Sequence, residues 1–231
     1  MRLEARNLSF RYTNGTRQVL NHVELTVESG ERVGIMAPSG FGKTTLCKIL
    51  AGYERPDEGE VVLSWRKTEE AGKLRFGGGN DGESLCSRRS IENIRGYCPV
   101  QMVWQHPELS VNPKRRLKTV LAEGDWPPGQ SEFRERILRE LGILKEWEER
   151  YPVEVSGGEL QRFCIARALG ARTELLIADE ITTMLDLVTQ GQIWSFLLKE
   201  LKERGIGLIA VSHSPELLEK VCDRIVRLSD V

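Results

Sequence analysis

The sequence of 231 residues lacks the features of a membrane-spanning or nucleic-acid-binding protein. Its strongest apolar run, at 175–178, stops at Asp179 and Glu180, far short of the roughly 18–20 residues that cross a bilayer. The 33 basic and 34 acidic residues leave a formal net charge of −1, so no basic excess points to nucleic acid. With 29% charged and 40% hydrophobic residues, the composition is that of a globular protein and excludes disorder, collagen and coiled coil.

Cysteines are few and scattered. None of the five forms a Cys-x-x-Cys pair or has histidines at zinc spacing, and we expect buried thiols in a reducing compartment (Cys47, Cys86, Cys98, Cys164 and Cys222). Residues 1–6 carry one acid and two bases where a secretory signal has its apolar region. We therefore expect the chain to remain in the cytoplasm.

The order of patterns predicts one α/β domain over residues 1–231. Segments 3–12 and 19–27 alternate apolar and polar residues around a turn at 13–16, which predicts a hairpin. A buried strand is expected at 31–36, a helix at 44–50 and a helical subdomain at about 106–165, followed by strands at 175–178 and 207–211 with helices at 188–202 and 215–221. This alternation predicts a mostly parallel core sheet. The polar stretch 66–96, with glycines at 77–82, is expected to be an exposed, mobile loop.

A glycine-rich segment lies between the first buried strand and the following helix. Such a loop presents backbone N–H groups to an anion, the helix N-terminus adds partial positive charge, and a lysine reaches the terminal phosphates. Residue 37 is alanine where the strict Gly-x-x-x-x-Gly-Lys-Ser/Thr pattern has glycine, and an ordinary strand-to-helix turn is the alternative. The predicted phosphate-binding residues are Ser39, Gly40, Phe41, Gly42, Lys43, Thr44 and Thr45.

Two carboxylates follow the buried strand at 175–178, about 135 residues after Lys43. Beside a phosphate loop, Asp179 is expected to bind Mg²⁺ together with Thr44, and Glu180 to orient and polarise the water that attacks the γ-phosphate of ATP. The alternative is two solvated carboxylates at a strand end.

The segment 151–162 contains Val155, Ser156, Gly157, Gly158 and Glu159, and it resembles the Leu-Ser-Gly-Gly-Gln signature of ATP-binding cassette (ABC) proteins. The serine and glycines open a predicted helix, so they form a second site for an anion. The resemblance implies a P-loop NTPase fold in which the signature of one cassette closes over ATP held by another cassette. A lone chain is then expected to hydrolyse ATP poorly.

Other positions match this family one by one. The resemblance implies that Tyr12 stacks on adenine, that Gln105 is the glutamine that senses Mg²⁺ and the γ-phosphate, that Asp186 borders the nucleotide, and that His213 contacts the γ-phosphate. Taken singly, such a tyrosine or histidine is more often a packing or surface residue. Residues 106–117 are where a permease helix is expected to dock.

The sequences of segments 101–113 and 185–190 are similar to those of the ATP-binding subunits of oligopeptide, dipeptide and nickel importers. This resemblance implies ATP and Mg²⁺ as cofactors and a place on the inner face of the cell membrane. It also implies a second cassette, identical or different, membrane permease subunits and, indirectly, an extracytoplasmic substrate-binding protein. Two alternatives remain: a nucleotide-binding regulatory or weakly hydrolysing subunit, suggested by Ala37 and Glu159, and a soluble ABC ATPase without a transport role.

Overall fold

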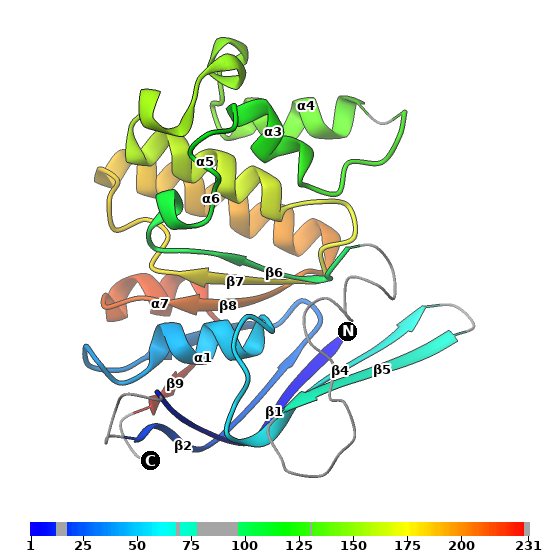
Figure 1. Cartoon of the computed structure of the whole chain (residues 1–231), viewed down its shortest axis with the longest axis vertical. Coiled ribbons are helices and arrows are strands. Elements are labelled where there is room, and N and C mark those ends of the chain that lie inside the picture. The colour runs from blue at the N-terminus through cyan, green and yellow to red at the C-terminus, as the bar shows by residue number, and fades with distance from the viewer. Residues whose placement is uncertain (13–17, 68–69, 78–96, 130, 229–231) are drawn as a thin grey trace.

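A computed structural model describes residues 1–12, 18–67, 70–77, 97–129 and 131–228, with the backbone alone for 65–67 and 70–77. Its strands form two sheets (Figure 1). The antiparallel sheet has the order β2-β1-β4-β5 and consists of β1 (Arg2–Arg11), β2 (Gln18–Glu28), β4 (Glu58–Lys67) and β5 (Glu70–Gly77). The parallel sheet has the order β6-β7-β8-β3-β9 and consists of β3 (Arg32–Met36), β6 (Val100–Val103), β7 (Leu175–Asp179), β8 (Gly207–Val211) and β9 (Arg224–Arg227).

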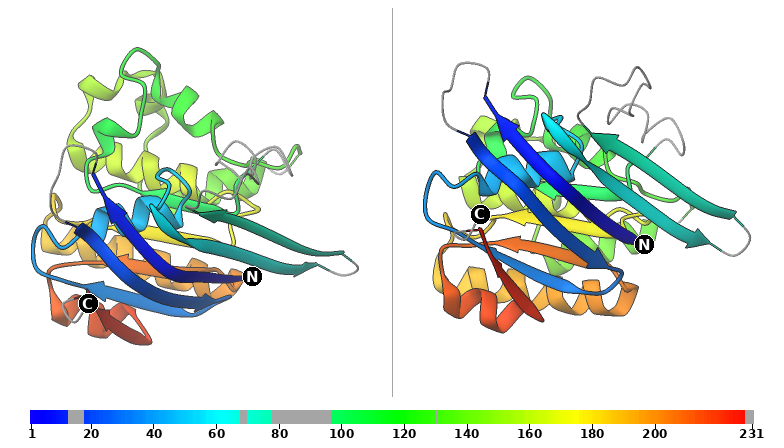
Figure 2. Two further views of the ribbon diagram at one scale, coloured as in Figure 1. Left: turned by 60° about the horizontal axis from the view of Figure 1, so that its bottom comes forward. Right: turned by 90° about the horizontal axis from the view of Figure 1, so that it is seen from below.

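Helices cover both faces of the parallel sheet. Helix α1 (Lys43–Leu50) lies between the two sheets, and α5 (Gly157–Ala168), α6 (Leu187–Arg204) and α7 (Pro215–Val221) pack on the opposite face (Figures 1 and 2). Side chains of β7 alternate between these layers: Leu175 and Ile177 join the core around α1, and Leu176 joins the core around α5 and α6. All five β7 residues are buried, as expected for a central parallel strand.

The segment between β6 and β7 is mainly helical. It contains α3 (Leu117–Ala122), α4 (Ser131–Glu140) and the short 3-10 helices η1 (Pro107–Leu109), η2 (Lys145–Glu149) and η3 (Pro152–Glu154). The predicted apolar face of α4 is buried through Ile137 and Leu138, and Phe133 packs against the same core. In Figure 1, α3 and α4 lie at the end of the molecule farthest from the antiparallel sheet.

The structure confirms the predicted hairpin, the strands at 31–36, 175–178 and 207–211, and the helices that follow them. It shows that the prediction of one loop over 66–96 is wrong at its start, because β4 continues to Lys67 and pairs with β5 from Glu60↔Gly77 to Lys67↔Glu70. Strand β5 is an edge strand, where polar sequences are common, so its composition resembled a loop. The expected turn at 13–16, the glycines from 78 to 82 and Cys86 lie outside the described residues.

Cys47, Cys98 and Cys164 are buried thiols, Cys222 is half-buried, and none of these four forms a disulfide. None of the helices in the described ranges combines the length and apolar composition needed to cross a membrane.

Candidate active site

Four neighbouring parallel strands, β6, β7, β8 and β3, end at the same edge of the sheet. Gln105 follows β6, the pair Asp179 and Glu180 ends β7, His213 follows β8, and the glycine-rich loop follows β3. Residues separated by up to about 175 positions in the chain are brought together because the carboxyl ends of parallel strands share one edge.

The glycine-rich loop wraps around the side chain of Lys43. The Lys43 side chain is buried, and its Nζ donates hydrogen bonds to the carbonyl oxygens of Ala37, at 2.9 Å, and Pro38, at 3.2 Å. Gly42 precedes α1 with φ of +79°, and a Cβ atom there would lie 2.7 Å from Cγ1 of Val19. Gly42 therefore has both a backbone and a steric reason to be glycine.

Asp179 lies beneath this loop with only 1% of its side chain exposed. Burial raises the pKa of its carboxyl, the charge of Glu180 raises it further, and a hydrogen bond from Thr44 and the charge of Lys43 oppose the rise. Its Oδ1 is buried and has no hydrogen-bond partner within the described part of the chain. A buried carboxylate oxygen left in this way, beside a threonine hydroxyl, fits a hard cation.

The Glu180 carboxylate is held from two sides. Gln105 Nε2 donates to Oε2 at 3.0 Å, and His213 Nε2 lies 2.9 Å from Oε1. Glu180 has φ of +51°, a left-handed conformation that costs energy for a residue other than glycine. The carboxylate faces a cleft of about 450 Å³ lined by Tyr12, Val19, Ser39, Gly40, Gly42, Lys43, Thr44, Thr45, Gln105, Glu180 and His213.

Tyr12 stands at the rim of this cleft. Its side chain is 44% exposed, its ring meets Phe10 edge-on at a centroid distance of 4.9 Å, and its hydroxyl lies 2.9 Å from Oγ1 of Thr45. The sequence prediction included Tyr12 but not its contact with Thr45 or the wall formed by Val19. No local pattern signals these contacts, because β1, β2 and α1 meet only in the fold.

The signature residues lie outside the lining of this cleft, as do Phe41, Asp186 and the buried Asp179. Ser156 caps α5: its Oγ accepts from the Glu159 backbone N–H at 3.2 Å, and Glu159 Oε2 accepts from the Ser156 N–H at 2.7 Å. A Cβ atom at Gly158 would lie 2.6 Å from Leu185, so the signature packs closely against the segment after β7. Asp186 caps α6, and its Oδ1 accepts from the backbone N–H groups of Val188 and Thr189 at 3.0 Å each.

A family model described as "ABC transporter" matches residues 20–183, from β2 to just beyond Glu180. The chain belongs to this family. It is similar to the nickel import ATP-binding protein NikE of Escherichia coli (strain K12), at 34% identity over 92% of this chain and 76% of that protein. NikE of Rhodospirillum rubrum is 33% identical over 93% of this chain and 73% of that protein.

A solved structure of the same fold is the dimeric ATP-binding cassette MJ0796 in a post-hydrolysis state, bound to ADP and Pi. Its TM-score is 0.74 at 25% identity, and the match covers 97% of this chain and 93% of that chain. A second dimeric structure of MJ0796 has a TM-score of 0.73 at 26% identity, over 97% of this chain and 93% of that chain. The present chain is accordingly an ATP hydrolase of the ABC type.

The departures from the usual ABC motifs have local explanations. Ala37 has no positive φ, so a Cβ atom is tolerated there. Glu159 fills the third position of a capping box, which glutamate and glutamine both satisfy. Ile181, where the family commonly has proline, is buried, and Ser214, where aspartate is common, caps α7 by accepting from the N–H of Leu217. None of these changes removes a side chain that lines the cleft.

Proposed function

We propose that the chain is the ATP-hydrolysing subunit that powers an importer of peptides or of nickel complexes. The observation that supports hydrolysis most directly is the Glu180 carboxylate, which lies between Gln105 and His213 and faces the phosphate loop. The import of nickel is supported by the NikE relatives, which match over nearly the whole chain. Peptides are proposed as an alternative cargo because segments 101–113 and 185–190 are similar to those of the wider importer group.

In the proposed mechanism, backbone N–H groups of the loop and Lys43 hold the phosphates of ATP. Thr44, Gln105 and Asp179 are the residues that hold Mg²⁺, and the unpartnered Oδ1 of Asp179 supports this set. Mg²⁺ takes few carboxylates and completes its shell with phosphate and water, so a set with one carboxylate suits it. When bound, the ion neutralises charge on the phosphates.

The chemical step is assigned to Glu180 and His213. A water oxygen bonds to the γ-phosphorus while the bond from that phosphorus to the bridging oxygen breaks, and ADP leaves with that oxygen. Glu180 orients the water and accepts its proton, and His213 contacts the γ-phosphate. Each oxygen of Glu180 has one side-chain partner and a further lone pair, so a water can donate to the carboxylate while both contacts persist.

A second cassette is proposed as the partner that completes the site. The signature around Ser156 contributes no residue to the lining of the cleft, so we propose that a signature from a second cassette completes the site. Met184, which lies beside Gly157, is 51% exposed, and Leu187 (84%) and Val188 (71%) at the start of α6 are exposed as well. Such exposed apolar side chains suit a protein interface. The dimeric structures of MJ0796 support the same arrangement.

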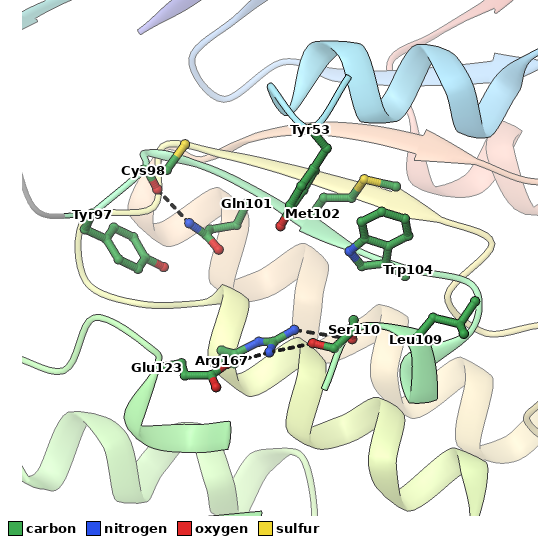
Figure 3. Close-up of a pocket in the computed structure, with 10 residues that line it drawn as sticks. All are labelled: Tyr53, Tyr97, Cys98, Gln101, Met102, Trp104, Leu109, Ser110, Glu123 and Arg167. Carbon is green, nitrogen blue, oxygen red and sulfur yellow. Dashed lines mark hydrogen bonds and ion pairs between the residues drawn. The ribbon is translucent and has the colours of Figure 1, made fainter. Parts of the chain in front are cut away.

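Permease subunits are proposed to dock in a groove beside η1 (Figure 3). Its volume is about 400 Å³, and Tyr53, Trp104 and Leu109 line one end while Glu123 and Arg167 line the other. Leu109 is 76% exposed, and Arg167 is fixed by a hydrogen bond to the Ser110 carbonyl at 3.0 Å. An amphipathic helix suits such a groove.

This docking would hold the chain on the inner face of the cell membrane, with an extracytoplasmic substrate-binding protein delivering the cargo. We expect no nucleic-acid partner, since the net charge is −1.

The decisive test uses two variants. We expect Glu180→Gln to keep ATP binding, to lose about 10²–10⁴-fold in turnover and to accumulate as a closed ATP-bound dimer. Lys43→Ala is expected to lose ATP binding. The measurements are ATP affinity, phosphate release and molecular mass with ATP. Full turnover by Glu180→Gln contradicts the role of Glu180, and unchanged binding by Lys43→Ala contradicts the phosphate loop.

A further inference from the structure

Gln161 is a buried amide on helix α5, five residues after Ser156. Its side chain is 3% exposed, and its Nε2 donates to the carbonyl oxygen of Trp104 at 3.0 Å. Its Oε1 is buried and has no hydrogen-bond partner in the described ranges. Leaving a buried polar atom unpaired costs about 1–3 kcal/mol, which offsets the roughly 0.5–1.5 kcal/mol that a hydrogen bond such as the one to Trp104 contributes. Stability alone therefore gives little reason for an amide at this position.

The atom that Gln161 binds belongs to the peptide group between Trp104 and Gln105. Because a peptide group is planar, fixing the Trp104 carbonyl also fixes the direction of the N–Cα bond of Gln105. Gln105 then reaches Glu180, with its Nε2 at 3.0 Å from Oε2. One hydrogen bond from α5 thus controls the backbone that aims Gln105 into the cleft.

The Trp104 ring gives this peptide a second support. It meets the ring of Tyr53 edge-on at a centroid distance of 5.2 Å, and Nζ of Lys48, on α1, lies 5.4 Å from its centroid. The Trp104 side chain is therefore held from the side of the phosphate-loop helix, and its carbonyl is held from the side of the signature helix. A shift of α5 relative to α1 has to act on this peptide.

We infer that Gln161 is a positioning residue, which sets the orientation of Gln105 according to the position of the signature helix. This inference rests on the proposed role of Gln105 at the nucleotide. Ser156 and Gln161 lie on one rigid helix, about 7–8 Å apart along its axis, so an anion that engages Ser156 moves Gln161 as well. The unpaired Oε1 provides a second acceptor for a different arrangement of the same segment.

The test measures how strongly Mg²⁺ increases the affinity of the full chain for a fluorescent ATP analogue. Gln161→Met preserves the length of the side chain and removes the amide. We expect it to reduce the Mg²⁺ enhancement about five- to tenfold, as Gln105→Ala does. In the double variant the second substitution should add less than about twofold, because effects transmitted through one residue do not add.

A matched control is Thr173→Val, which removes another buried hydrogen bond to a backbone carbonyl, that of Ala168 at the far end of α5. It is expected to lower the melting temperature without changing the Mg²⁺ enhancement. If Gln161→Met does not fold, Gln161→Asn shortens the amide so that it no longer reaches Trp104, and the same result is expected.

Three results overturn the inference: an unchanged Mg²⁺ enhancement in Gln161→Met while Gln105→Ala is impaired, independent effects in the double variant, or an equal loss in Thr173→Val. A normal Mg²⁺ response of Gln105→Ala has a different meaning, because it refutes the assignment of Gln105 itself together with the inference.

Discussion

The buried carboxylate of Glu200 ties α4 to α6, and removing its charge is expected to destabilise the fold. Glu200 is 1% exposed and accepts from both Nη atoms of Arg136, at 2.7 and 2.9 Å, and from Arg204 at 3.3 Å. Burial alone would raise the pKa of Glu200, but the hydrogen bonds and charge of Arg136, with Arg204, outweigh it and leave the pKa lowered. The ionised carboxylate is therefore the stable form in the fold.

The size of the effect follows from this burial. Breaking a buried ion pair costs about 3–5 kcal/mol, and because the Arg136 side chain is 36% exposed and partly screened, we expect about 2–3 kcal/mol for Glu200→Gln. In a chain of this size each kcal/mol lowers the melting temperature by roughly 2–4 °C, so the expected decrease is about 4–12 °C.

The assay is thermal unfolding without nucleotide, followed by circular dichroism. Glu149→Gln is a matched control, since Lys118 Nζ lies 2.9 and 3.0 Å from the two Glu149 oxygens, yet the two side chains are 52% and 61% exposed. An exposed pair contributes little, so this variant is expected to melt like the wild type. Equal melting temperatures for the two variants would refute the reasoning.

Three further predictions concern the cleft and the surface around it. Gly42→Ala is expected to lower the free energy of unfolding by about 1–3 kcal/mol and to weaken ATP binding more than Gly40→Ala does, since both glycines have positive φ but a Cβ atom has space only at Gly40. Equal losses for the two variants in unfolding and binding assays would contradict this. Tyr12→Phe keeps the ring and frees the hydroxyl of Thr45, in the first turn of α1, so ATP should bind up to about fivefold more tightly in titrations. Weaker ATP binding by this variant would contradict the prediction. The hydrogen bond from Arg172 lowers the pKa of Asp125, so the stability that this pair contributes above about pH 4 is lost as the pH falls through the folded-state pKa. Asp125→Asn should therefore reduce the decrease of the melting temperature at acidic pH. An unchanged dependence of the melting temperature on pH would exclude Asp125 as a source.

The sequence predicted those parts of the site whose signals are local. The loop around Lys43 and the carboxylates after β7 are readable because each follows an apolar strand. The contacts of Glu180 are different in kind. Gln105 and His213 lie 75 and 33 residues away in the chain, and only the strand order β6-β7-β8 brings their side chains to the two oxygens.

The distinction between local signals and long-range pairing also explains where the predicted fold was wrong or incomplete. Residues 70–77 look like a polar loop, yet they form β5 because β4 offers an unpaired edge. Strands β6 and β9 have four residues each, too few for a clear pattern, and they are set by their neighbours β7 and β3. Pairing therefore decided the structure wherever the local pattern was short or polar.

Under the proposed docking, Trp104 is the residue that would connect permease binding with hydrolysis. Its ring lines the proposed permease groove (Figure 3), and its carbonyl shares a peptide group with Gln105. A permease helix that shifts the Trp104 backbone would turn this peptide, and turning it would change the contact between Gln105 and Glu180. Because Gln161 holds the same carbonyl from the signature helix, the groove and the approach of a second cassette act on one peptide group. Hydrolysis can then depend on both partners without either of them touching Glu180.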